Sequence, residues 1–138
     1  MSYQVDWYQT ERIILCRVQG NITEADLWEI GQRLTMLLDQ GQSVVHVIFN
    51  LERMERFPKH LPVIRRILQE FFEHPRLGTI TIAGRVNPLA RVIAETLSKT
   101  FNVEYRGVAR DTQAAARDIQ KISMNAVLEI VENQTDRA

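Results

Sequence analysis

The sequence predicts an α/β domain with five strands and four helices, and three observations support this prediction. Residues 44–49 are apolar on both faces, rich in β-branched side chains and too short for a typical helix, which indicates a buried, parallel strand. Residues 3–8 alternate between apolar and polar side chains with the period of a half-buried strand. Apolar residues also recur at helical spacing in four longer segments.

The N-terminal part of the chain predicts a β-hairpin followed by a helix. Residues 3–8 and 13–18 are expected to form two strands, because only a short polar turn separates them. Thr23 is a favourable helix N-cap, and Asp26 follows it at nearly the spacing of a capping box. Gly41 is expected to end this first helix.

The remaining elements follow from the same signals. After the strand at 44–49 we expect a polar loop, a second helix, a fourth strand, a third helix, a fifth strand and a last helix. Their expected ranges are, in that order, 50–56, 58–73, 79–83, 87–101, 103–106 and 111–132. Asn87 caps the third helix with Pro88 at its first position, a favoured pairing.

The predicted order is therefore β-β-α-β-α-β-α-β-α. Strand–helix–strand units imply right-handed crossovers and parallel pairing. Together with the hairpin they predict a five-stranded mixed sheet with helices packed on it. Residues 1–138 are expected to be a single domain, in which 133–138 form a flexible tail.

Composition narrows the class of protein. Seventeen basic residues balance seventeen acidic ones, so bulk charge predicts neither nucleic-acid binding nor binding to a membrane surface. The apolar runs are too short for membrane insertion, and the N-terminus does not resemble a secretion signal. Cys16 is the only cysteine, which fits a reducing compartment. We therefore expect a cytoplasmic protein.

No motif in the sequence points to catalysis. There is no nucleophile elbow, no phosphate-binding glycine loop and no zinc pattern, so we expect neither a metal nor a cofactor. His46 is interpreted as a hydrogen-bonded core histidine, and Cys16 as a packing residue that is inert as a nucleophile. A non-catalytic protein is the prediction.

The element order and several segments resemble the STAS domain, the fold of anti-sigma-factor antagonists and of the cytoplasmic tails of sulfate transporters. The hairpin and first helix, ILCRVQGNITEADLWEIGQRL, and the buried strand, VVHVIFNLERM, are similar to family patterns. The segment HPRLGTITIAGRVNPLARVIAETLSKTFNV resembles an uncharacterised bacterial STAS-like subgroup. The resemblance implies a signalling role exerted through a protein partner.

One family feature is missing from this sequence. In regulatory STAS domains, a partner kinase phosphorylates a Ser at the start of the helix after the buried strand. Between Ser43 and Thr79 this chain has neither Ser nor Thr. Charge switching by phosphorylation of such a hydroxyl is therefore not expected here.

The candidate binding site lies around the start of the second helix and the neighbouring start of the third. Free N–H groups and basic side chains at such helix starts favour an anion or an acidic partner. The candidate residues are Arg53, Arg56, Phe57, Lys59, His60, Arg85, Asn87 and Arg91. The alternative is a solvated surface, because Glu52 and Glu55 dilute the positive charge. Phe57 is either a staple against Leu61 or an anchor for a partner.

Three functions remain open at this point. The leading one is a non-catalytic interaction or regulatory module of STAS type that docks through residues 50–60 and the start of the second helix. The alternative is a domain that binds a small ligand, either a lipid or an anion such as a nucleotide, in a cavity under that helix lined by Phe71, Phe72 and Leu61. An unrecognised enzyme is the third.

The last helix is longer than a small α/β domain needs. Its second half adds apolar residues beyond the main stripe, namely Met124, Val127, Leu128 and Val131. This pattern predicts either a homodimer that packs through the helix or a helix that folds across the sheet.

Overall fold

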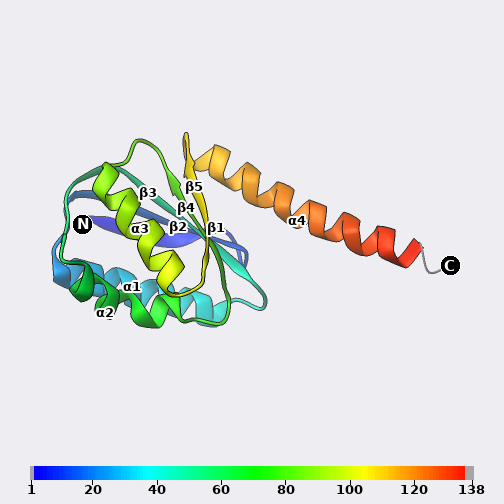
Figure 1. Cartoon of the computed structure of the whole chain (residues 1–138), viewed down its shortest axis with the longest axis horizontal. Helices are drawn as coiled ribbons and strands as arrows, with labels where there is room; N and C mark the ends of the chain where they lie inside the picture. Colours follow the sequence, from blue (N-terminus) through cyan, green and yellow to red (C-terminus); the bar gives the residue numbers. More distant parts are fainter. Residues whose placement is uncertain (1, 136–138) are drawn as a thin grey trace.

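The computed structural model describes residues 2–135, apart from the side chains of 123, 125–127 and 129–135. It contains one five-stranded sheet and four helices (Figure 1). The strands are β1 (Tyr3–Gln9), β2 (Ile13–Asn21), β3 (Val45–Arg56), β4 (Leu77–Ala83) and β5 (Glu104–Ala109). The helices are α1 (Glu24–Gln40), α2 (Leu61–Phe72), α3 (Pro88–Thr100) and α4 (Thr112–Thr135).

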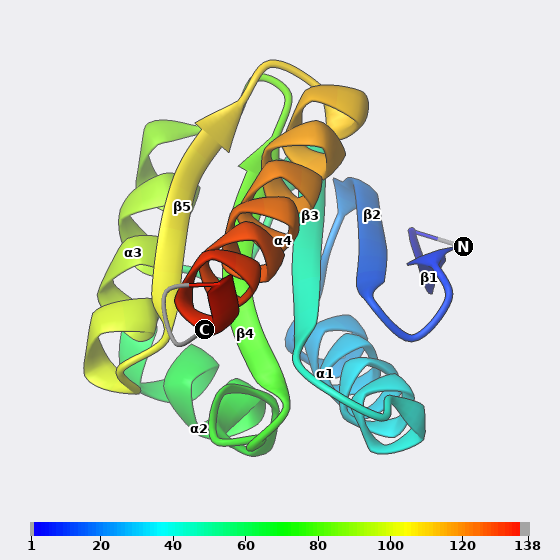
Figure 2. The same cartoon turned by 90° about the vertical axis from the view of Figure 1, so that its right-hand side faces the viewer.

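The strands lie in the sheet in the order in which they occur in the chain, β1-β2-β3-β4-β5. β1 and β2 are antiparallel, and the pairs from β2 to β5 are all parallel. Since each crossover advances the sheet in the same direction, α1, α2 and α3 all lie on one face, which we call the three-helix face. α4 lies on the opposite face, the α4 face (Figure 2). The predicted fold class and element order are confirmed.

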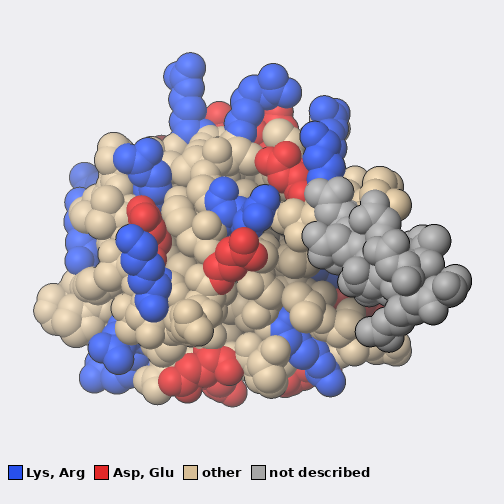
Figure 3. Space-filling model, turned by 45° about the vertical axis from the view of Figure 1, so that its right-hand side comes forward, with Lys and Arg blue, Asp and Glu red and all other residues tan. Residues whose placement is uncertain are grey.

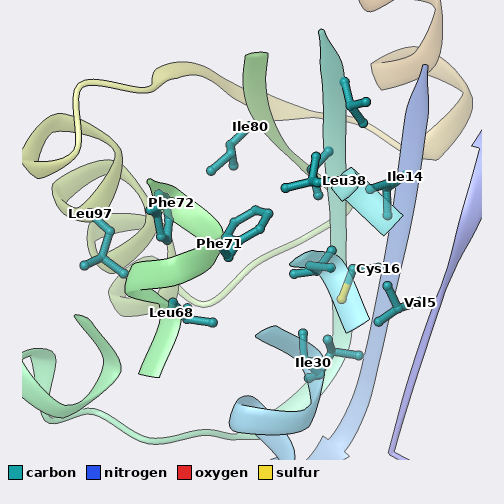
Figure 4. Packing of buried hydrophobic residues seen from close by; sticks show 14 of the residues in the cluster. Val5, Ile14, Cys16, Ile30, Leu38, Leu68, Phe71, Phe72, Ile80 and Leu97 are labelled. Carbon is teal, nitrogen blue, oxygen red and sulfur yellow. The ribbon is translucent and has the colours of Figure 1, made fainter. Parts of the chain in front are cut away.

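The main core lies on the three-helix face, between the sheet and α1, α2 and α3 (Figure 4). Phe71 of α2 is 1 % exposed and packs edge-on against Phe49 and Phe72, with ring centroids 6.0 and 5.1 Å apart. Phe72 in turn stacks on Phe101 at 5.3 Å. These aromatic contacts join α2 to β3 and to the end of α3.

The α4 face has a much smaller core. Its buried residues are Ile13, Ile48, Ala83, Ala115, Ala116 and Ile119. The described residues that α4 contributes to this cluster come from its first turns, and the second half of the helix extends beyond the sheet (Figure 1). α4 continues to Thr135, three residues into the segment expected to be a tail, and 136–138 lie outside the described residues.

Both predicted helix caps that depend on a side chain are confirmed. The Thr23 hydroxyl accepts a hydrogen bond from the Asp26 N–H at 3.1 Å, and the Asp26 carboxylate accepts one from the Thr23 N–H at 3.0 Å. Asn87 accepts from the Leu89 N–H at 2.8 Å. Gly41 is the C-cap residue of α1.

The prediction of a polar loop at residues 50–56 is wrong, because these residues extend β3. They pair with the end of β2, where Gln19 lies opposite Arg53 and Asn21 opposite Arg56. Two register shifts interrupt this pairing. Each such bulge adds a residue to β3 and so disturbs the alternation that would have identified a strand.

The predicted start of the second helix is also corrected. α2 begins at Leu61 rather than at Pro58, and His60 is its N-cap residue. Pro62 fits in the first turn, where the missing N–H costs little. Residues 57–60 form a connector between β3 and α2.

Candidate functional site

The predicted site residues lie near the carboxyl ends of the parallel strands, where open α/β sheets commonly bind their ligands. Arg53 and Arg56 belong to the extension of β3, Phe57, Lys59 and His60 to the connector, Arg85 and Asn87 to the β4–α3 segment, and Arg91 to α3. All of these side chains are exposed except Phe57, which is half-buried. Phe57 packs against the core and also lines a cavity, and its contact with Leu61 as a staple stays a prediction.

This cavity has a volume of about 120 Å³ and lies between the sheet and α1, α2 and α3. Every side chain that lines it is apolar, and Cys16 contributes a buried sulfur. Its half-buried lining residues include Met54, Phe57 and Pro58, at the end of β3 and in the connector, and we call this side of the cavity its mouth. Ala90, in the first turn of α3, also lines it. The connector and the start of α3 therefore border the same cavity, as the expected proximity of the two helix starts requires.

The lining differs from the prediction in two residues. Phe72 is in the wall, as expected. Phe71 is packed into the core beside the cavity. Leu61 instead lines a separate groove that also contains Arg65 of α2 and Leu97 of α3.

The helix starts offer fewer free N–H groups than their sequence suggests. In α2, Pro62 has no N–H, and the Val63 and Ile64 N–H groups both donate to the His60 carbonyl at 3.1 Å. In α3, Pro88 has no N–H, and the Leu89 N–H is occupied by Asn87. An anion at this edge would therefore be bound mainly by side chains. Binding of an anion or partner by the candidate residues stays a prediction.

The charged side chains of this edge are mixed. Figure 3 shows Lys and Arg side chains spread over this side of the molecule, with Asp and Glu side chains among them. Lys59 is directly associated with the cavity mouth, because its Nζ lies 5.7 Å from the centroid of the Phe57 ring. A cation at this distance is attracted to the ring face.

A second, polar hollow of about 540 Å³ lies beside the end of β2, and sequence reasoning missed it. Its lining residues are Tyr3, Gln4, Arg17, Val18, Gln19, Asn50, Glu52 and Arg53. Arg53 therefore lines a different hollow from Phe57. The available signal was the alternation in β2, where Cys16 and Val18 are buried while Arg17 and Gln19 are exposed.

Asn50 orders one side of the polar hollow. Its Nδ2 donates to the Thr112 hydroxyl of α4 at 3.1 Å, and its Oδ1 accepts from the Glu52 N–H at 3.2 Å. The Asn50 amide therefore links the middle of β3 to the start of α4. Asp111 immediately precedes α4, and its carboxylate accepts from the Ala114 N–H at 2.8 Å; this bond lowers the pKa of Asp111.

Two titratable groups, Cys16 and His46, are engaged in packing and in hydrogen bonding, respectively. Burial raises the pKa of the Cys16 thiol to about 12, which keeps it protonated and confirms the interpretation as an inert packing residue. The Nδ1 of His46 lies 2.8 Å from the Thr79 hydroxyl, which confirms the predicted hydrogen bond, although the ring is half-buried rather than in the core. Desolvation lowers the pKa of His46. Within the described residues no cluster of His, Cys, Asp and Glu has the arrangement of a metal site.

Comparisons with known proteins identify the fold. No family model and no curated protein matches the sequence. An uncharacterised protein of the DUF3478 family from Shewanella loihica PV-4, described as having a SpoIIAA-like fold, superposes with a TM-score of 0.60 at 12 % identity, over 85 % of this chain and 91 % of that one. The chain has a STAS-like fold, of the SpoIIAA-like type.

SpoIIAA itself gives two further matches. The phosphorylated form of this Bacillus cell fate determinant superposes with a TM-score of 0.53 at 16 % identity, over 83 % of this chain and 97 % of that one. The unphosphorylated form, named as an anti-sigma factor antagonist, gives 0.52 at 17 %, over 86 % and 97 %. At these identities the likeness establishes the STAS-like fold and no further property.

Among the described residues, no helix combines the length and apolar character needed to cross a membrane.

Proposed function

We propose that this chain is a non-catalytic regulatory module that docks a cytoplasmic protein partner through residues 50–60 and the start of α2. The observation that supports this most is the extension of β3. It presents exposed charged side chains on paired strands, so the surface is held in one conformation before a partner arrives. Preorganisation of this kind reduces the entropy cost of association.

The extension is anchored at both of its ends. The Asn50 Nδ2 donates to the Thr112 hydroxyl at 3.1 Å, and the Ile22 N–H donates to the Arg56 carbonyl at 2.7 Å. Phe57 then packs onto the core directly after the strand. The exposed residues between these anchors are Glu52, Arg53, Glu55 and Arg56, so the docking surface has alternating charge. Alternating charge favours a specific, complementary partner over nonspecific binding to a polyanion.

SpoIIAA, with the same type of fold, is named as an anti-sigma factor antagonist and has a phosphorylated form. By analogy we propose a signalling role in a bacterial cell. Because this chain has neither Ser nor Thr at 44–78, we propose that the concentration of partner or ligand controls docking in place of phosphorylation in that segment.

The test is charge reversal at the docking surface. Affinity capture with the wild-type chain supplies a partner, whose Kd is then measured by titration calorimetry with purified proteins. The double variant Arg56→Glu/Lys59→Glu should weaken binding about tenfold or more. Lys99→Glu/Arg117→Glu is the matched control, because these exposed residues lie in α3 and α4 outside the docking surface. Wild-type affinity in Arg56→Glu/Lys59→Glu, or equal losses in both double variants, would reject this surface.

We also propose that two copies associate through the second half of α4. Met124 and Leu128 are 65 % and 52 % exposed, and the side chains of Val127 and Val131 lie outside the described residues. Sedimentation of the intact chain and of one that ends at Ile122 tests this proposal. The intact chain should sediment as a dimer and the short one as a monomer, whereas a monomer in both cases would contradict it.

A further inference from the structure

The apolar cavity under the connector is larger than a packing defect. Protein interiors contain few voids larger than a water molecule. At about 120 Å³ this cavity is comparable to engineered apolar cavities of roughly 150 Å³, which remain dry and bind benzene. It therefore has room for an alkyl chain of limited length or for a single ring. Its wholly apolar lining gives water no hydrogen-bond partners.

The mouth of the cavity is adaptable and lies at the C-terminal edge of the sheet. Met54 and Phe57 are half-buried and line the cavity, while Leu68 and Leu97 on its inner side are buried. Methionine has three rotatable bonds and fills irregular gaps, so its side chain adjusts to an entering group at low cost. The mouth therefore allows a chain to enter without unfolding a helix.

A positive charge lies at this mouth. Lys59 Nζ is 5.7 Å from the ring centroid of Phe57, a residue of the cavity lining. In the part of the chain that the structure describes, Lys59 forms no ion pair. Because the cavity lining is apolar, the polar end of any ligand must remain at the mouth, within reach of this ammonium group.

We propose that the cavity is a binding site for an amphipathic anion, specifically a monocarboxylate with a medium-length alkyl chain. The chain fills the cavity and the carboxylate faces Lys59. The mouth of this site lies within the proposed docking surface, but ligand binding is measured without a protein partner and does not depend on docking. A solvent-exposed ion pair at the mouth contributes modestly, and burial of the chain supplies most of the affinity.

Octanoate is the probe. NMR of the isoleucine methyl groups of the wild-type chain shows where it binds. Ile22, Ile64 and Ile80 line the cavity, whereas Ile13 and Ile48 lie in the α4-face cluster. Octanoate, added below its micelle concentration, should shift the methyl resonances of the first group saturably and leave the second group unchanged. Absence of saturable shifts, or equal shifts in both groups, would overturn the proposal without any variant.

Two substitutions then test the two ends of the site by calorimetry. Ala94→Leu fills the cavity from α3 and should abolish octanoate binding, with unchanged Ile13 and Ile48 methyl resonances as the evidence of folding. Lys59→Gln should weaken octanoate about two- to fivefold. Lys99→Gln, on the exposed surface of α3, is the matched control and should bind as the wild type does.

Ligand charge gives the complementary test. Octanol should bind the wild type and Lys59→Gln equally, because it has the same chain and no charge. Octyltrimethylammonium should bind the wild type more weakly than octanoate does. Octanoate binding that survives Ala94→Leu would reject the cavity as the site, and equal affinity for the anionic and cationic probes would reject the role of Lys59.

Discussion

The two faces of the sheet are covered very differently. The three-helix face buries apolar side chains from four strands against α1, α2 and α3. On the α4 face, within the described residues, the buried sheet residues that meet the first turns of α4 are Ile13, Ile48 and Ala83, with Leu15 and Ala109 packed beside them. Polar groups occupy other positions there, such as His46 with its hydrogen bond to Thr79. Most of the apolar burial that stabilises the fold therefore lies on the three-helix face. Much of the α4 face is left available for contacts with solvent or with other molecules.

The largest expected effect compares core substitutions on the two faces. Phe71→Ala removes a 1 % exposed ring from the three-helix face and should lower the free energy of unfolding by about 3–5 kcal/mol. Ile119→Ala on the α4 face should cost about 2 kcal/mol, because a small cluster near solvent relaxes more easily. Urea unfolding measures both, with m-values as a check that the unfolded states are comparable. Equal losses would contradict the comparison.

A smaller effect is expected from substitutions at two glycines with positive φ, Gly84 and Gly20. Gly84 has φ +84°, and a Cβ added there would lie 2.9 Å from the Cβ of Glu52. Gly20 has φ +68° with open space around it, so Gly20→Ala isolates the backbone term of about 1–2 kcal/mol. Gly84→Ala should destabilise the protein by about 1 kcal/mol more, because a β-carbon of β3 must move. If thermal unfolding shows the same loss for both variants, the contact with Glu52 imposes no constraint.

The helix caps on the two faces allow a finer comparison. Thr23→Ala removes the cap of α1 on the three-helix face and should lower the free energy of unfolding by about 1 kcal/mol. Asp111→Ala removes the cap of α4, and its effect should be confined to faster amide hydrogen exchange in that helix, since few contacts connect α4 to the core. A global loss of stability in Asp111→Ala as large as that in Thr23→Ala would show that α4 is more strongly coupled to the sheet. Amide exchange in α4 that is no faster than in the wild type would contradict the role of Asp111 as a cap.

The smallest effect is a pH dependence from the α4 face. Desolvation lowers the pKa of His46 below its ordinary value of 6.5. Two smaller contributions come from Glu104, which raises this pKa, and from Arg106, which lowers it. The unfolded chain therefore binds a proton more readily, so the stability contribution of neutral His46 is present above pH 6.5 and decreases as the pH falls below it.

Two measurements check this pH dependence. An NMR titration of His46 should have its midpoint below 6.5, and His46→Gln should flatten the acid limb of the stability profile. His60→Gln, at an exposed position, should leave the contribution of His46 intact. A midpoint at or above 6.5 would show that desolvation does not dominate the pKa of His46.

Short-range rules were enough to predict much of this molecule from its sequence. The capping box at Thr23 and the cap at Asn87 depend on residues two or three positions away, so their chemistry is visible in the chain. The order of strands and helices follows from periodic burial, and the crossover rule turns that order into a mixed sheet. The residues of the candidate site were likewise brought to one edge because parallel strands end together.

Tertiary structure alone decided how that edge is arranged. Two bulges in β3 change which side chains point to each face, and so Arg53 and Phe57, four positions apart, line different hollows. The cavity is the space left unfilled where side chains from the sheet and three helices meet, and its size depends on all of their positions together. Periodicity reports which residues are buried, but only the packed structure shows where packing is incomplete.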